Sequence, residues 1–274
     1  MFNSVFLFNL EVSMDRPILY TLIIIMNRKD VYDEFISSLE KQEDVFYEII
    51  CIDNCNNQYK SARKAYNEAA MKANGEFLIF LHPDIRFTSK HDLYYITKYV
   101  ENIKSFGVIG VAGSPYDLVD GKRVILSNIY HGNDRCRAGE SINRPEVVQT
   151  VDECFFVVEK EEFSKVLFSQ KEGWHLYAVE LCLQFEKLGK RNYVVPANLW
   201  HLSDGRSLDY KYVVQLRELI NEYKDSIEHI NTTVKKWGTK GWINYYYNIY
   251  YLCKQWVKGK VKYKLKRRLG NISR

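Results

Sequence analysis

Apolar runs alternate with amphipathic segments along the first half of the chain. Residues 18–26 are almost continuously apolar and rich in β-branched side chains, which is typical of a parallel strand covered on both faces. Apolar runs predict three further strands, at residues 46–52, 77–81 and 108–112. Helical spacing predicts helices between them, at residues 30–42, 61–73 and 91–103. This order predicts an α/β fold with a mostly parallel sheet flanked by helices.

Two of these helices carry additional local signals. Asp30 is placed to act as the N-cap of the first helix. In the second helix, alanines form a small-residue face suited to tight packing, at Ala62, Ala65, Ala69 and Ala70.

The second half of the chain is less regular. Residues 113–149 predict loops with room for a hairpin, and residues 151–158 predict another strand. A helix at 174–188, a short strand at 193–195 and a helix at 213–227 follow. From there to the end the chain is aromatic and basic. We therefore expect an α/β domain over residues 15–210 and a helical extension over residues 211–274.

Composition and charge narrow the class of protein. With 274 residues, 46% of them hydrophobic and 15% aromatic, the chain is neither disordered nor a small disulfide scaffold. The net charge of +5 conceals an asymmetry, because residues 233–274 contain twelve Lys or Arg and no Asp or Glu. The remainder carries 27 basic and 34 acidic residues. The protein is thus an acidic domain with a basic tail.

The sequence gives no sign of export or of a membrane span. No apolar run approaches the length of a transmembrane helix, and the first thirteen residues lack a basic region and a cleavage site. The six cysteines show no paired CxxC spacing. We expect reduced thiols in a cytoplasmic protein, with either Met1 or Met14 as the start.

Polar residues at strand ends are the main candidates for chemistry. There is no GxGxxG, P-loop, HExxH or GxSxG motif. Asp53 ends the second predicted strand, and His82-Pro83-Asp84 ends the third. A carboxylate beside an imidazole suits Mg²⁺ or Mn²⁺, which would neutralise a diphosphate. The alternative is that His82 and Asp84 belong to an ordinary turn.

Several segments, taken in order, resemble a known family. They are 23–28 (IIIMNR), 38–42 (SLEKQ), 52–54 (IDN), 66–70 (YNEAA), 75–85 (GEFLIFLHPDI), 151–155 (VDECF), 174–182 (WHLYAVELC) and 201–207 (HLSDGRS). Together they resemble a family 2 glycosyltransferase of the GT-A fold, from the bacterial branch in which His-x-Asp replaces Asp-x-Asp. The resemblance spans about residues 17–210 and implies a Rossmann-like GT-A sheet.

The resemblance also implies roles for individual residues. Asn27 and Asp53 correspond to the positions that hold the base and ribose of a sugar nucleotide, and Asn67 to a helix asparagine supporting that site. Asp84 takes the metal-binding carboxylate position, and His82 replaces the first Asp of the motif. His201 matches a late histidine that completes metal coordination in some members, and Arg206 lies in a following loop, within reach of the diphosphate.

The catalytic base has three candidates. Inverting transfer needs a carboxylate that takes the proton of the acceptor hydroxyl. Glu180 lies nine residues before Gly189, a spacing that resembles the later acid of the family's helix motif. It also shares a helical face with Gln184 and Lys187, which is typical of a solvated stripe. Asp152 and Glu153, at a strand end, are the alternatives.

The expected function is transfer of a sugar from a nucleotide-sugar donor to a glycan or lipid-linked acceptor in cell-surface polysaccharide synthesis. We expect inversion and dependence on Mg²⁺ or Mn²⁺. The alternatives are a non-catalytic nucleotide-sugar-binding module and a peripheral membrane scaffold.

The tail adds an expectation about location. Its aromatic residues precede its lysines rather than interleaving with them, which disfavours nucleic-acid binding. Rings suited to the headgroup layer followed by basic residues predict peripheral attachment to an anionic membrane, on the inner face of the cell membrane. Residues 257–269 fit a helix better than a strand, and a solvated basic tail is the alternative.

Overall fold

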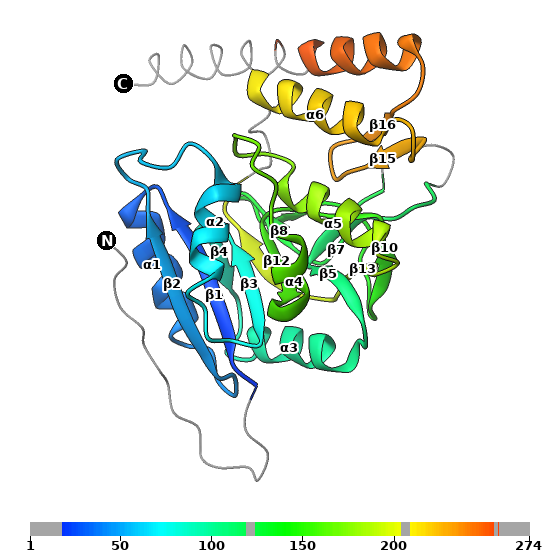
Figure 1. Ribbon diagram of the computed structural model, residues 1–274. Coiled ribbons are helices and arrows are strands. Elements are labelled where there is room, and N and C mark those ends of the chain that lie inside the picture. Colours follow the sequence, from blue (N-terminus) through cyan, green and yellow to red (C-terminus); the bar gives the residue numbers. More distant parts are fainter. Residues whose placement is uncertain (1–17, 119–123, 204–208, 255–256, 258–274) are drawn as a thin grey trace. The chain divides into compact units, whose positions relative to one another are not determined.

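The computed structural model describes residues 18–118, 124–203, 209–254 and 257 (Figure 1). The chain divides into two compact units. Among the described residues, the first comprises 18–203 together with 231–235, and the second comprises 209–230 and the residues from 236 onward. The expected boundary between residues 210 and 211 does not anticipate that the loop 231–235 belongs to the first unit.

A seven-stranded sheet forms the centre of the first unit, in the order β10-β13-β5-β12-β3-β1-β2. Its strands are β1 (Tyr20–Met26), β2 (Tyr47–Asp53), β3 (Phe77–Leu81), β5 (Phe106–Gly110), β10 (Glu146–Val148), β12 (Phe155–Glu159) and β13 (Arg191–Val194). Strands β10 and β12 run opposite to the others. The sheet is therefore mostly parallel, as expected, with one antiparallel strand inserted in its middle.

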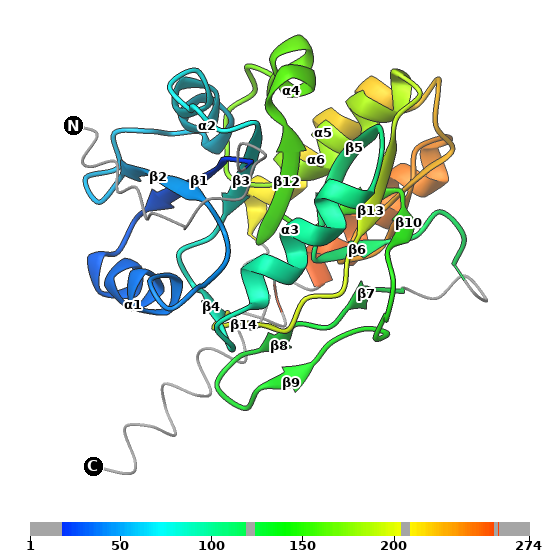
Figure 2. The same ribbon diagram turned by 90° about the horizontal axis from the view of Figure 1, so that it is seen from below.

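Helices cover both faces of this sheet. On one face lie α1 (Lys29–Leu39) and α3 (Asp92–Asn102), and on the other α2 (Ala62–Ala70), α4 (Lys160–Val166) and α5 (Tyr177–Lys187) (Figure 2). The four alanines of α2 are buried against the sheet, which confirms their packing role. Asp30 lies inside the first turn of α1 and pairs with Arg28, so the expectation that it caps the helix is wrong.

Two smaller sheets flank the first unit's strand ends. One contains β11 (Thr150–Val151), β6 (Ala112–Ser114) and β7 (Leu126–Ser127), and the other contains β4 (Ile85–Phe87), β14 (Leu199–His201), β8 (Tyr130–His131) and β9 (Cys136–Arg137). The strand expected at residues 151–158 is thus interrupted. Asp152 and Glu153 lie in the turn between β11 and β12, since the chain changes sheets there.

The carboxyl ends of β2, β1 and β3 meet at one edge of the sheet. Met26 pairs with Asp53, and Leu81, the last residue of β3, pairs with Ile24 of β1, so that His82 follows directly at this edge. Strand β12 is antiparallel to β3, and its first residue, Phe155, pairs with Leu81. The turn carrying Asp152 and Glu153 therefore arrives at the same edge, where ligands bind in open α/β sheets.

The second unit contains α6 (Tyr210–Tyr223), β15 (His229–Asn231) except for its last residue, β16 (Lys236–Gly238) and a helix over residues 242–254. Asp209 caps α6 by accepting the backbone N–H of Tyr212. Trp237 is fully buried and packs edge-on against Tyr251. In the described part of the chain, no helix is both long and apolar enough to cross a bilayer.

Candidate active site

Three side chains that could bind a metal ion converge where β3 ends. They are His82, Asp84 and His201, and we call them the metal-type cluster. His82 follows β3, and Asp84 directly precedes β4. Strand β14 is antiparallel to β4 and pairs His201 with Ile85, and the backbone N–H of Leu202 donates to the carbonyl of Asp84 at 3.0 Å. The pairing of these two short strands thus brings together residues more than a hundred positions apart in the sequence.

The geometry of this cluster fits a divalent cation. Asp84 Oδ1 lies 3.3 Å from His201 Nε2 and 4.0 Å from His82 Nδ1, and one ligand atom from each residue lies within 4.8 Å of the others. Asp84 Oδ1 and His201 Nε2 are buried and have no hydrogen-bond partner among the described residues. Buried polar atoms are rarely left unpaired, and a bound metal would satisfy both.

The protonation states of the cluster depend on burial and on the charges of the neighbouring side chains. Burial opposes ionisation of Asp84, but His201 and His82 outweigh it and lower the pKa of Asp84 to about 2. Burial lowers the pKa of His82, with only partial compensation from Asp84. Burial also acts on His201, yet the carboxylates of Asp84 and Asp152 raise its pKa. An ionised carboxylate beside imidazoles is a donor set that suits Mn²⁺ or Mg²⁺.

Tyr177, the first residue of α5, orients His82. Its hydroxyl lies 3.0 Å from His82 Nε2, while His82 Nδ1 is the nitrogen that faces Asp84. If Nδ1 coordinates a metal, Nε2 carries the hydrogen, and this N–H donates a hydrogen bond to the Tyr177 oxygen. Such outer hydrogen bonds fix the orientation and tautomer of a metal-binding histidine.

Replacing Tyr177 by phenylalanine is expected to weaken Mn²⁺ binding about tenfold, because His82 loses the hydrogen bond that orients it. Isothermal titration with Mn²⁺ measures the effect. Tyr47→Phe is the matched control, since Tyr47 is equally buried and packs on the opposite face of the sheet. Equal Mn²⁺ affinity of Tyr177→Phe and wild type would exclude the orienting role.

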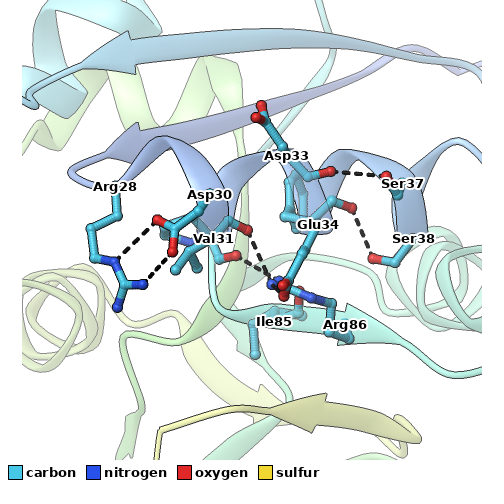
Figure 3. Close-up of polar contacts among 11 residues, drawn as sticks. Arg28, Asp30, Val31, Asp33, Glu34, Ser37, Ser38, Ile85 and Arg86 are labelled. Carbon is cyan, nitrogen blue, oxygen red and sulfur yellow. Dashed lines mark hydrogen bonds and ion pairs between the residues drawn. The ribbon is translucent and has the colours of Figure 1, made fainter.

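Arg86 holds the turn that carries Asp84 (Figure 3). It is 7% exposed, and its guanidinium donates hydrogen bonds at 2.7–3.0 Å to four acceptors, namely the carbonyl oxygens of Pro83, Ile85 and Val31 and the carboxylate of Glu34. A planar fork with five N–H groups suits this arrangement better than a lysine would. Arg86 therefore ties β4 and the turn that carries Asp84 to α1.

Asp152 faces the cluster from the turn before β12. Its Oδ1 accepts the backbone N–H of Cys154 at 3.1 Å, and its Oδ2 accepts the Thr233 hydroxyl at 2.8 Å. Burial opposes its ionisation, but these bonds and the charge of His201 lower the pKa of Asp152. Asp152 is therefore an ionised carboxylate at neutral pH.

Glu153 has the opposite character. Burial and the neighbouring Asp152 raise its pKa to about 8. Its Oε1 is buried without a hydrogen-bond partner among the described residues. Two adjacent carboxyl groups are thus pushed apart in pKa, which leaves only Asp152 ionised at neutral pH.

Asn27 and Asp53 lie at the neighbouring strand ends. The side chain of Asn54 joins them, because it donates to Asn27 Oδ1 at 3.0 Å while its backbone directly follows Asp53. Asp53 is exposed, and the backbone N–H of Cys55 donates to its Oδ1 at 2.9 Å. The two residues therefore border the same edge as the metal-type cluster.

Asn67 and Arg206 are the other two predicted donor-binding residues. Both polar groups of the Asn67 amide bond the backbone of Phe168, at 2.9 and 3.0 Å, so Asn67 joins α2 to the segment before α5. These bonds give Asn67 a structural role, and its expected support of the nucleotide site stays a prediction. Arg206 lies outside the described residues.

Glu180 is enclosed in a buried ion-pair network. Arg63 Nε lies 2.8 Å from its Oε2, Lys171 Nζ lies 2.7 Å from its Oε1, and the Ser169 hydroxyl also donates to it. Glu180 and Arg63 are each 2% exposed, so the solvated stripe considered for this helix face is wrong at Glu180. Because each carboxylate oxygen is paired with a cationic side chain, Arg63 or Lys171, the geometry favours a structural role for Glu180 over that of the base.

Glu180→Gln is expected to lower the free energy of unfolding by about 3 kcal/mol or more, because Arg63 would keep an uncompensated charge in the core. Urea unfolding measures this loss. The exposed pair of Lys29 and Asp33 provides the control, since Asp33→Asn removes an ion pair that contributes little. An unchanged stability for Glu180→Gln would contradict the structural assignment.

Four residues around the cluster were not predicted as site residues: Tyr177, Arg86, His131 and Thr233. His131 lies beside His201 in the pairing of β8 with β14, with ring centroids 5.5 Å apart. In the sequence, the only indication of a role for His131 is that it is a histidine within the predicted loop region 113–149. Thr233 has none, because it lies far from the other site residues along the chain.

A mostly parallel sheet flanked by helices, with a His-x-Asp turn at its carboxyl edge, is the arrangement expected of a GT-A fold. The model of the glycosyltransferase-like family matches residues 21–223. That match covers most of the chain, so the protein belongs to this family. A curated relative, the product of open reading frame 6 of the ATP synthase subunits region of Fuscovulum blasticum, is 27% identical over 222 residues. The alignment covers 77% of this chain and 85% of the relative.

Solved structures share the fold. They include the mannosyltransferase PcManGT from Pyrobaculum calidifontis with GDP-Man and Mn²⁺ (12% identity, TM-score 0.53, 78% of this chain) and S. aureus TarS with UDP-GlcNAc (15%, 0.52, 77%). GalNAc-T7 with UDP, GalNAc and Mn²⁺ is a third (13%, 0.52, 77%). This chain covers 65%, 68% and 50% of those chains respectively.

Proposed function

We propose that this protein transfers a sugar from a nucleotide-sugar donor to a glycan or lipid-linked acceptor, with inversion, in cell-surface polysaccharide synthesis. The observation that carries the proposal is the convergence of Asp84, His201 and His82 at the edge bordered by Asn27 and Asp53. Similar folds bind GDP-Man, UDP-GlcNAc and UDP, which supports a sugar nucleotide as the ligand.

Asp84 and His201 would hold the divalent metal, with His82 Nδ1 as a third ligand oriented by Tyr177. When bound, the metal supplies positive charge that neutralises the donor diphosphate and stabilises it as a leaving group. Mn²⁺ accompanies the sugar nucleotide or its products in two of the similar structures, which supports this assignment. Asn27 and Asp53 would then contact the nucleoside.

Asp152 is the proposed general base. The acceptor oxygen attacks the anomeric carbon, the bond from that carbon to the diphosphate breaks, and Asp152 takes the proton of the acceptor hydroxyl. Asp152 is ionised and interacts electrostatically with His201 and His82, whereas Glu153 keeps its proton at neutral pH. The carboxylate of Glu180 is already paired on both oxygens.

Turnover distinguishes this enzyme from a non-catalytic nucleotide-sugar-binding module. Incubation with UDP-, GDP- and dTDP-sugars and Mn²⁺ should release nucleoside diphosphate from one of them, as followed by ³¹P NMR. An added acceptor should accelerate the release and yield a product of inverted anomeric configuration. Tight binding of a donor without any release would favour the binding module.

The helix over residues 242–254 favours attachment of the protein to an anionic membrane. Trp242, Ile243, Tyr246, Tyr247 and Tyr250 are 55–72% exposed and follow helical spacing, so they form one exposed stripe of four aromatic residues and an isoleucine. Asn248 and Leu252, on the other side of the helix, are buried. Such rings suit the headgroup layer of a bilayer.

Basic residues follow this stripe in the sequence, at Lys258, Lys260, Lys262, Lys264, Lys266, Arg267 and Arg268. At about 1 kcal/mol each near an anionic surface, they would add several kcal/mol to membrane binding. These residues, and the expected helix at 257–269, lie outside the described part of the chain apart from residue 257.

Replacing Trp242, Tyr246 and Tyr250 by alanine is expected to reduce co-sedimentation with phosphatidylserine vesicles at least tenfold, because amphipathic rings leave the interface. All three side chains are exposed, so the fold should survive the substitution. Binding of wild type should fall with added salt and be weak on phosphatidylcholine vesicles. Equal sedimentation of the triple variant and wild type would remove the membrane role of the stripe.

A further inference from the structure

A loop from beyond the family match enters the catalytic unit. The match ends at residue 223, yet residues 231–235 belong to the same compact unit as the metal-type cluster. Asn231 anchors this loop and is fully buried. Its backbone N–H donates to Gln149 Oε1 at 2.7 Å, and its side chain donates to the carbonyl oxygens of Pro115 and Tyr116 at 2.8 and 2.7 Å.

Further bonds fix the course of the loop. The Thr150 hydroxyl donates to the carbonyl oxygen of Asn231, and this bond ties the loop to β11. Within the loop, the Thr232 oxygen accepts the backbone N–H groups of Val234 and Lys235, both at 3.2 Å. The position of Thr233 between these anchored residues is therefore set by several independent contacts.

Thr233 uses this position to contact Asp152. Its hydroxyl donates to Asp152 Oδ2 at 2.8 Å, while the backbone N–H of Cys154 holds the other oxygen. A carboxylate held at both oxygens cannot rotate freely, and each oxygen retains a lone pair for another hydrogen bond. Hydrogen bonds that restrict a reacting group in this way contribute to its preorganisation.

We propose that Thr233 is a positioning residue for the reaction, and that it orients Asp152 toward the acceptor hydroxyl from a loop outside the family match. This inference rests on the proposed function, because it takes Asp152 to be the general base. It follows that the C-terminal part of the chain contributes to the active site as well as to any membrane contact.

Thr233→Val removes the hydroxyl and preserves the shape of the side chain. The expected result is a fall in kcat of about 10- to 100-fold, with the Kd for donor and the affinity for Mn²⁺ unchanged. Thr233→Ser should restore kcat to within a few fold of wild type, because serine supplies the same donor. Thr97→Val is the matched control, since Thr97 is a buried threonine of α3 that does not contact the site.

A double-mutant cycle with Asp152→Asn tests whether Thr233 acts through Asp152. On the Asp152→Asn background, Thr233→Val should have no further effect on kcat, because the group it positions no longer accepts a proton. Additive losses would overturn the inference, and so would equal kcat values for wild type and Thr233→Val. If wild type itself shows no transfer with any donor, the proposed function fails first, which is a distinguishable outcome.

Discussion

Asp84→Asn is expected to lower metal-dependent turnover of the donor by at least about 100-fold. The substitution keeps the size of the side chain and removes the negative charge that Asp84 carries with a pKa of about 2. A metal that neutralises a leaving diphosphate is worth several kcal/mol in the transition state, and each 1.4 kcal/mol is a factor of ten in rate. Mn²⁺ titration and turnover measured on the same preparation check both parts of the expectation.

Asp30→Asn is the matched control for this experiment. Asp30 is an exposed carboxylate on α1 that pairs with Arg28 rather than with the cluster. It should bind Mn²⁺ and turn over the donor as wild type does. If Asp84→Asn keeps the Mn²⁺ affinity of wild type, Asp84 is not a metal ligand and the convergence with His201 has another purpose.

Asp152→Asn is expected to reduce the rate of sugar transfer by about 10²- to 10⁴-fold while the Kd for the donor changes little. The variant retains an oxygen that accepts hydrogen bonds from Thr233 and Cys154, but it cannot take a proton from the acceptor. Single-turnover kinetics separate this loss from a change in binding.

Glu153→Gln and Glu180→Gln complete the comparison of the three candidate bases. Glu153→Gln should retain most of the transfer rate at neutral pH, because the carboxyl group it replaces already carries a proton there. Glu180→Gln should affect stability, and any enzyme that remains folded should transfer at a rate close to that of wild type. A large loss of rate in Glu153→Gln, with Asp152→Asn unaffected, would move the base to Glu153.

The alternation of apolar runs and helical segments was sufficient to predict most strands of the sheet and helices α1, α2, α3 and α5, although not β10 or α4. Local spacing carries this information, because each strand and helix is buried on faces that its own sequence defines. The position of β12 was not predictable in the same way. Its antiparallel insertion between β3 and β5 depends on pairing with strands far away in the sequence.

The candidate site, like the sheet, could be predicted from the sequence only where local patterns carry the information. His82, Asp84 and Asp53 were recognisable because each follows an apolar run directly, and the end of a parallel strand lies at the ligand-binding edge. His201 required the resemblance to a family. The contacts made by Tyr177 and Thr233 arise only when residues about 80 to 95 positions apart meet in the folded chain.

Glu180 illustrates how a sequence pattern can mislead. Its helical neighbours Gln184 and Lys187 are polar, which is typical of a solvated face. The structure buries Glu180 instead, since Arg63 approaches from α2 and supplies the opposite charge. A buried carboxylate needs such a partner, and nothing in the local sequence reveals a partner 117 residues away.

Calorimetric titration of the full chain with UDP-, GDP- and dTDP-sugars, with and without Mn²⁺, tests the central claim most directly. The account predicts that one nucleotide class binds in the presence of Mn²⁺, that its affinity falls at least tenfold when the metal is removed, and that Asp84→Asn abolishes this metal dependence. Failure of every sugar nucleotide to bind in the presence of Mn²⁺, or equal binding with and without the metal, would contradict it.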